Sequence, residues 1–325
     1  MMTVPLSILD LAIVGEGESV RASLEGSVRL AQRAEALGYR RVWYAEHHNI
    51  AIIASSATAV LIAHIAAHTQ TIRLGAGGIM LPNHAPLIIA EQFGTLATLH
   101  PDRIDLGLGR APGTDQVTAR ALRRDPRTAD NFPQDVLELQ GYLTGETRIP
   151  HVHATPGRGT HVPLYILGSS TFGAQLAARL GLPFAFASHF APAALMEAIR
   201  LYRAQFTPSA QLSRPHVIAG VNVIATDTVE EAQRHLVARR RSFIRAVFSP
   251  PGHRLTDPEI DGVLRSPQAA MIEQMFTYTA LGPPAAVRTF LEAFVAQTGA
   301  DELMVVHQAE TVEARLRSLE LLAGA

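Results

Sequence analysis

The sequence contains no cysteine and no lysine, so all 28 of its cationic side chains are arginines. The first absence excludes disulfides, thiolate metal sites and thiol nucleophiles. The second excludes Schiff-base chemistry, pyridoxal phosphate anchoring and a Walker-type phosphate loop, because each of these needs a lysine. Any bound anion must be held by arginine, backbone amides or hydroxyl groups. An enzyme with this composition is expected to use a cofactor that brings its own reactivity.

A strong net charge and long apolar runs are also lacking. The chain has 325 residues and a formal net charge of −1, which gives no argument for nucleic acid or an anionic membrane as a partner. No apolar run reaches the roughly 18 residues of a membrane span. The start, Met1-Met2-Thr3, lacks the basic residues of a signal peptide. We therefore expect a cytoplasmic protein.

Apolar runs that predict strands alternate with runs that predict helices. This alternation favours a parallel sheet, and the chain length fits one (β/α)8 TIM barrel over residues 1–325 with loop insertions. The expected strands are 6–14, 41–44, 72–81, 103–108, 162–167, 183–187, 216–225 and 302–306. The expected helices are 21–37, 55–67, 86–99, 132–143, 171–180, 192–206, 229–247 and 312–322, with 269–296 helical in two pieces broken at Gly282-Pro283-Pro284. Insertions are expected near 114–131, 144–161 and 249–275, the last opening with a loop rich in proline and aspartate, 249–268.

The strand at 41–44 runs into four polar residues, Glu46-His47-His48-Asn49. The carboxyl ends of the strands are where an α/β barrel presents its chemistry. This tip could be a metal site, an acid–base site or a polar loop. Adjacent histidines on a strand point to opposite faces, which disfavours one metal between them, and no metal site is predicted. A histidine with a near-neutral pKa at a barrel mouth suits general acid–base work, which we favour.

Three other features lie at or near expected strand ends. Gly77 and Gly78 fall inside a strand, where glycine marks a bulge, a barrel corner or the close approach of a flat ligand. Arg110 follows a strand and would be a fixed cation at the functional face. Gly168-Ser169-Ser170 precede a helix and form either an anion cradle or an ordinary helix cap.

Taken together, these stretches resemble the bacterial luciferase-like flavin monooxygenase family over nearly the whole chain. The resemblance is closer to the single-chain bacterial members than to the light-emitting heterodimer. The segments that carry it, in this order, are Ala45-Glu46-His47-His48-Asn49, Leu74 through Pro86, Ala90-Glu91-Gln92-Phe93, Arg103-Ile104-Asp105-Leu106-Gly107 with Arg110, and Leu167-Gly168-Ser169-Ser170.

The resemblance implies that reduced FMN binds at the carboxyl ends of the barrel strands. Gly77 and Gly78 match the family's cis peptide, or tight bulge, beneath the isoalloxazine ring. The phosphate would be held by a group matched to the family's phosphate segment: Arg110, Gly168, Ser169 and Ser170. This would supply the lysine-free anion site that the composition demands.

The resemblance also assigns roles at the strand tip. Glu46 would lie near the flavin, and His47 would be the acid–base group facing the reacting flavin carbon and the substrate. His48 would support it. The wider set of pocket candidates is Asp10, His48, Asn49, Ser188 and His189.

Two positions depart from the light-emitting subunit. Gly109 stands where that subunit has a reactive cysteine, and Ser169 stands where it has a glutamate. Neither change forbids flavin binding, but we do not expect light emission.

The favoured hypothesis is a monooxygenase that uses reduced FMN and O₂ to oxygenate a small, mostly apolar substrate. The chain has no dinucleotide-binding fingerprint, so a separate NAD(P)H-dependent reductase is expected to supply the FMN. Alternatives on the same barrel are deazaflavin-dependent hydride transfer and flavin binding without turnover, with a metal-dependent hydrolase a remote third. The apolar helices 55–67 and 86–99, together with the family resemblance, predict a homodimer or higher homo-oligomer.

Overall fold

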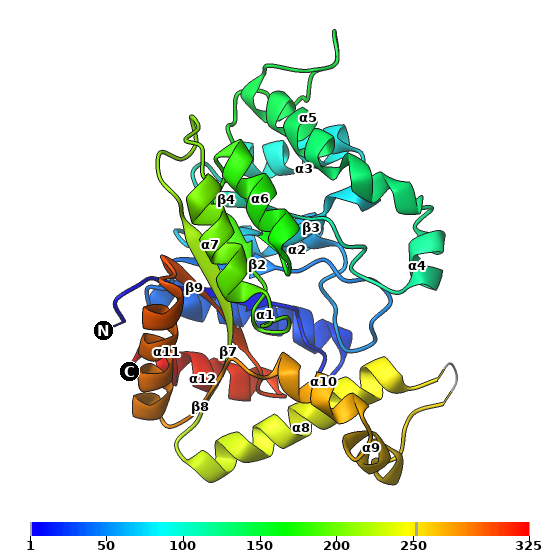
Figure 1. Cartoon of the computed structure of the whole chain (residues 1–325), viewed down its shortest axis with the longest axis vertical. Coiled ribbons are helices and arrows are strands. Elements are labelled where there is room, and N and C mark those ends of the chain that lie inside the picture. The colour runs from blue at the N-terminus through cyan, green and yellow to red at the C-terminus, as the bar shows by residue number, and fades with distance from the viewer. Residues whose placement is uncertain (1, 251–252, 325) are drawn as a thin grey trace.

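A parallel β-barrel forms the centre of the molecule (Figure 1). The computed structural model describes residues 2–250 and 253–324. The strand order is β6-β5-β4-β3-β2-β1-β9-β7, and pairing of β6 with β7 closes the ring. These strands are β1 (Leu6–Asp10), β2 (Arg41–Tyr44), β3 (Arg73–Met80), β4 (Ile104–Gly109), β5 (Leu164–Gly168), β6 (Phe184–Phe186), β7 (Val217–Ala225) and β9 (Glu302–His307). The prediction of a (β/α)8 TIM barrel is confirmed.

One further strand, β8 (Thr279–Gly282), lies outside the ring. The prediction that 269–296 is helical on both sides of a break at 282–284 is wrong here. The nine-residue β7 is longer than the three-residue β6, so part of its edge would lack a partner. β8 pairs with Asn222 through Ala225 of β7 and satisfies that edge.

The prediction of a loop over 249–268 is also wrong in part, because α9 (Asp257–Leu264) lies within it. The helix begins with a capping box in which Thr256 and Glu259 satisfy each other's backbone N–H groups. Two positions of the predicted insertion, 251 and 252, lie outside the described residues. The insertion at 114–131 contains a short helix, α4 (Gln116–Ala121), and a 3₁₀ turn (Pro126–Asn131).

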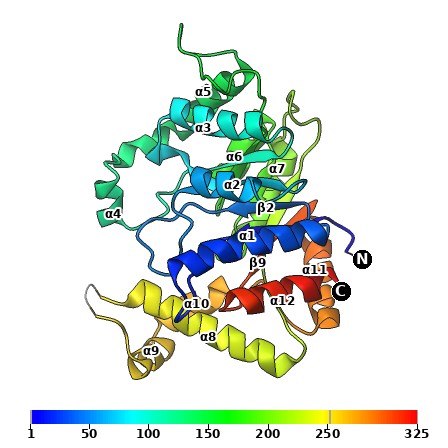
Figure 2. The same ribbon diagram turned by 180° about the vertical axis from the view of Figure 1, so that it is seen from behind.

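The remaining helices surround the barrel, with α1 and α12 side by side (Figure 2). Each agrees with its predicted range within a few residues at either end, except that the helical piece predicted from 269 to the break at 282 ends at Met275. They are α1 (Val20–Ala36), α2 (Thr58–Ala66), α3 (Pro86–Leu99), α5 (Phe132–Thr144), α6 (Thr171–Leu180), α7 (Leu195–Gln205), α8 (Val229–Phe248), α10 (Gln268–Met275), α11 (Pro284–Thr298) and α12 (Val312–Ala323). No helix among the described residues is long and apolar enough to cross a membrane.

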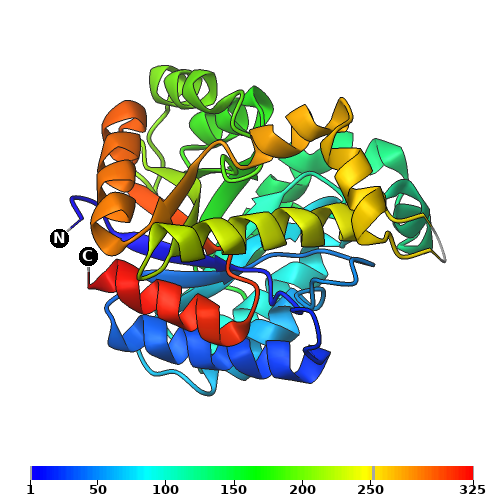
Figure 3. The ribbon, with the colours of Figure 1, turned by 90° about the horizontal axis from the view of Figure 1, so that it is seen from below.

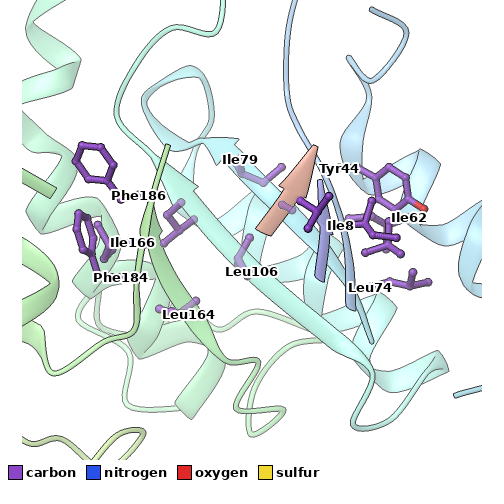
Figure 4. Packing of buried hydrophobic residues seen from close by; sticks show 14 of the residues in the cluster. Ile8, Tyr44, Ile62, Leu74, Ile79, Leu106, Leu164, Ile166, Phe184 and Phe186 are labelled. Carbon is purple, nitrogen blue, oxygen red and sulfur yellow. The ribbon is translucent and has the colours of Figure 1, made fainter. Parts of the chain in front are cut away.

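Side-chain alternation along the strands divides the apolar core in two. Val42 and Tyr44 of β2 belong to the large cluster between barrel and helices, part of which Figure 4 shows. Trp43 and Ala45 belong to a smaller cluster inside the barrel. A third cluster packs α8 against α9 and α10 (Figure 3). This third unit lies beside the barrel mouth and supplies part of the cavity described below.

Charged groups close the opposite end of the barrel interior. The Arg41 guanidinium contacts Asp105 at 2.6 Å and Glu302 at 2.9 Å, and all three side chains are buried. Burial alone would lower the pKa of Arg41, but the two carboxylates outweigh it and raise that pKa. The amino ends of the strands therefore end in a fully paired ionic layer.

Candidate functional site

A cavity of about 470 Å³ opens at the carboxyl ends of the strands. Alternate residues of the strands and their extensions form its walls, because only every second side chain points inward. Among the described residues that line it, none is acidic. The residues that β1, β2 and β9 with their extensions contribute are Leu9, Leu11, Ile13, Trp43, Ala45, His47, Met304, Val306 and Gln308.

Because side chains alternate along β2, the polar residues that follow it point in two directions, toward the cavity and away from it. Trp43, Ala45 and His47 line the cavity, whereas Glu46 and His48 do not. Of the two adjacent imidazoles, the structure therefore brings His47 to the cavity and turns His48 away from it.

Glu46 is buried behind the cavity wall and joins two loops. Its carboxylate accepts hydrogen bonds from His48 at 2.9 Å, His84 at 2.9 Å, the Met80 amide at 2.9 Å and Asn83 at 3.1 Å. Burial would raise the pKa of this carboxyl, but these donors outweigh burial and hold that pKa below its usual value. An ionised Glu46 thus fixes the loop after β3 against the tip of β2, and so positions His47.

The His47 ring is oriented by the backbone carbonyl of Gly113, 3.3 Å from Nδ1. A carbonyl oxygen only accepts, so this contact requires the proton on Nδ1 and leaves the lone pair on Nε2. Burial lowers the pKa of His47, which favours the neutral ring. This tautomer leaves Nε2 of His47 able to accept a proton.

The floor of the cavity includes Gly77, and the Gly77–Gly78 peptide bond is cis. A side chain at Gly78 would meet the Gly107 carbonyl oxygen at 2.7 Å, and one at Gly77 would meet Trp43 Cβ at 2.9 Å. The register with β4 also shifts between Ala76 and Ile79. Only glycine fits these two positions without displacing the neighbouring strands.

A set of hydrogen-bond donors lies on another part of the wall, formed by Arg110 and the start of α6. Gly168, Ser169 and Ser170 line the cavity, and the Ser170 hydroxyl at the N-cap makes no capping bond, which leaves it and the first helix amides available. The Arg110 guanidinium lies 3.9 Å from the Phe172 ring centroid. Hydroxyls, helix amides and a guanidinium together suit a phosphate group, so the predicted phosphate-binding residues fit the chemistry of FMN.

The other pocket candidates separate into two groups. Asp10, Asn49 and Ser188 do not line the cavity. Asp10 accepts from Ser27 and the Ala12 amide, Asn49 donates to Thr118, and Ser188 donates to the Gly220 carbonyl. These bonds give each of the three a local structural role.

His189 differs, because it lines the cavity and its buried Nδ1 has no hydrogen-bonding partner among the described residues. Burial, with a smaller contribution from His47, lowers the pKa of His189 to about 4. It is therefore neutral at physiological pH.

Two residues with charged or amide side chains line the cavity but were missing from the sequence-based candidates, Arg239 and Gln308. Arg239 belongs to a run of three arginines, which favours a solvated helix face. Its spacing from Ala232, Leu236 and Phe243 instead places it on the apolar face of α8. An arginine at an apolar-face position is the signal that could have identified it.

Comparison with known proteins identifies the family and agrees with the fold. A family model described as luciferase-like monooxygenase matches residues 5–322. A luciferase-like monooxygenase of Escherichia coli K12 is 48% identical over 98% of this chain and 96% of its own. An N-acetyl-S-alkylcysteine monooxygenase of Bacillus subtilis is 39% identical over 72% of this chain and 71% of its own.

Solved structures extend the comparison. Apo-MsnO8 superposes with a TM-score of 0.84 at 36% identity, covering 99% of this chain and 98% of that one. Two structures with TM-scores of 0.71 share the fold alone. One is a Pseudomonas putida type II Baeyer–Villiger monooxygenase with FMN (16% identity, covering 99% of this chain and 97% of that one), and the other an F420-dependent secondary alcohol dehydrogenase (14% identity, 98% of each). On the family match and the close relatives, this chain belongs to the luciferase-like monooxygenase family and is an enzyme.

Proposed function

We propose that the protein is an FMN-dependent monooxygenase that uses reduced FMN and O₂ to oxygenate a small organic substrate. The observation that carries the proposal is one cavity that joins the Gly77 floor, the His47 base and the donor set at Arg110 and Ser170. A flat ring with a phosphate tail needs these features in one continuous space. Bound reduced FMN would supply the electrons and the carbon that activates O₂.

The residues of this chain have separate tasks in the proposal. Arg110, Ser169 and Ser170 would bind the phosphate. His47 would accept or return a proton through Nε2, while Glu46 holds its loop in place without contacting substrate. The apolar wall would exclude water from the reacting atoms. Glu46, expected at the flavin, thus becomes a positioning residue.

The proposal includes partners. A separate NAD(P)H-dependent flavin reductase would deliver the reduced FMN in the cytoplasm, and the chain would work as a homodimer or larger homo-oligomer. Exposed apolar residues on α2 and α3, including Val60, Ile88 and Leu99, support such an interface. The relative that acts on N-acetyl-S-alkylcysteines makes thioethers the first substrates to test.

A deazaflavin in place of FMN is the second candidate, because an F420-dependent enzyme shares the fold. Deazaflavin-dependent hydride transfer would need no O₂. Flavin binding without turnover would leave His47 without a chemical task.

The deciding experiment mixes the protein with photoreduced FMN, O₂ and a panel of thioethers, and follows oxygenated product by mass spectrometry with ¹⁸O₂. We expect one ¹⁸O atom per product and, for His47→Gln, turnover lower by about 100-fold or more with unchanged FMN affinity. Tight binding of F420 alone, or product without ¹⁸O, would refute the proposal. Equal turnover in the variant would refute the role of His47.

A further inference from the structure

Arg239 of α8 is a buried cation at the wall of the cavity, only 8% exposed. Its Nε donates to Gln308 Oε1 at 2.7 Å. No other hydrogen bond and no ion pair of Arg239 is found in residues 2–250 and 253–324. Neither of its two Nη nitrogens is fully buried, so both remain accessible from the cavity that Arg239 lines.

The orientation of Arg239 is set by a chain of side chains rooted in the barrel. Gln308 Nε2 donates to Asn222 Oδ1 at 2.7 Å, and Asn222 Nδ2 donates to the His189 carbonyl at 2.7 Å. Each amide in the chain thereby uses both its donor and its acceptor side. Gln308 can therefore present only its oxygen to Arg239, which fixes the plane of the guanidinium and leaves its outer edge to a ligand.

Two other arginines of the same helix differ from Arg239 because they pair with carboxylates. Arg241 and Arg245 both contact Asp257, and Arg241 also contacts Asp261. Burial, and then the nearby Arg315, lowers the pKa of Arg239 to about 10 against the opposing influence of Glu310, which forms no ion pair with Arg239 among the described residues, so Arg239 stays protonated at neutral pH. A charge that is buried, protonated and unpaired in the described structure calls for an anion from outside the chain.

That anion is distinct from the flavin phosphate. The phosphate donors follow β4 and β5, whereas Gln308 follows β9. In the ring order β1-β2-β3-β4-β5-β6-β7-β9, strands β4 and β9 lie on opposite sides of the barrel. The cavity therefore has one cationic group at each side and mostly apolar walls between them.

We propose that Arg239, held by Gln308, binds the carboxylate of the substrate, and that the enzyme selects small acids with an apolar body. A carboxylate offers two oxygens in one plane, which match the outer edge of a guanidinium. The inference deepens the proposed function and rests on it for the identity of the bound acid as substrate. Binding of the acid itself does not require flavin.

The test uses 4-phenylbutyrate and its neutral amide, 4-phenylbutyramide, as probes of equal shape. Each is titrated calorimetrically at pH 7 into flavin-free protein and into protein loaded with FMN. We expect the acid to bind at least tenfold more tightly than the amide. Arg239→Gln should remove this preference by weakening the acid alone, while Arg234→Gln, at an exposed position of the same helix, should keep it.

Several outcomes would overturn the inference. These are equal affinity of acid and amide for the wild type, no binding of the acid to either form, or a preference that survives Arg239→Gln. Loss of the preference in Arg110→Gln instead would place the acid at the phosphate donors and also overturn it. The wild-type comparison needs no variant to fold. Acid-selective binding without oxygenation of any acid would refute the proposed function while leaving this site intact.

Discussion

The two ends of the barrel both contain buried arginines, but only one end pairs them. At the amino ends of the strands, Arg41 contacts Asp105 and Glu302, and Arg73 also contacts Asp105. At the carboxyl ends, the neutral Gln308 is the one hydrogen-bonding partner of Arg239 in the described part of the chain. The cavity there has no acidic residue among those described.

We relate the paired arginine at the amino ends to stability and the arginine without an ion pair at the carboxyl ends to function. A buried ion pair with both partners present satisfies its own charges, and removing one partner leaves the other unsolvated. A buried charge without a partner does not stabilise the folded state as such a pair does. We explain its presence by a ligand that supplies the opposite charge. The same residue type, buried at both ends, therefore has opposite consequences at the two ends.

The largest expected effect comes from breaking the paired end. Arg41→Met leaves two buried carboxylates without their main partner, so we expect the free energy of unfolding to fall by about 3–5 kcal/mol. Urea denaturation followed by circular dichroism measures this. The matched control is Arg29→Met, which removes the exposed pair with Glu313 and should cost about 1 kcal/mol or less. Equal losses in the two variants would contradict the comparison.

The strand tips show how much of this the sequence could predict. The period of two along Trp43, Ala45 and His47 puts every second residue inside the barrel, so the inward histidine follows once the register is known. The role of Glu46 did not follow. Its partner His84 lies 38 residues away, and the bond between them exists only because β2 and β3 are neighbours.

The two elements that were predicted wrongly, β8 and α9, failed for different reasons. β8 is four residues long and owes its existence to the free edge of β7, which no local pattern reveals. α9, by contrast, carried a local signal in Thr256 and Glu259. Arg239 required both kinds of information, because its helix face can be read locally, whereas the lack of an ion-pair partner among the described residues depends on the whole cavity.

A second prediction concerns pH and compares histidines instead of arginines. The pKa of His189 falls from 6.5 to about 4 on folding, mainly through burial. Between pH 4 and 6.5 the unfolded chain therefore binds a proton at this residue that the folded chain does not bind. The free energy of unfolding is unaffected by His189 above pH 6.5 and decreases as the pH falls toward 4. A shift of this size corresponds to a loss of about 3 kcal/mol in the free energy of unfolding.

The measurement is the free energy of unfolding at several pH values for the wild type and His189→Asn. We expect a flatter dependence between pH 4 and 6.5 in the variant, and an unchanged one in His64→Asn on the exposed face of α2. Part of the pH dependence of the free energy of unfolding should persist in both variants, because burial also lowers the pKa of His307 to about 3. Parallel curves for wild type and His189→Asn would show that His189 is hydrated in the folded protein.

The smallest expected effect is the most informative, because it also comes from a buried arginine. Arg239→Met removes an unpaired charge, which is neutral or stabilising, and leaves the Gln308 oxygen without its donor, which costs about 1–3 kcal/mol. These contributions offset, so we expect the free energy of unfolding to stay within about 1 kcal/mol of wild type in the same urea titration. A loss as large as that of Arg41→Met would mean that Arg239 has a structural counter-charge. In that case the two ends of the barrel would not differ as proposed.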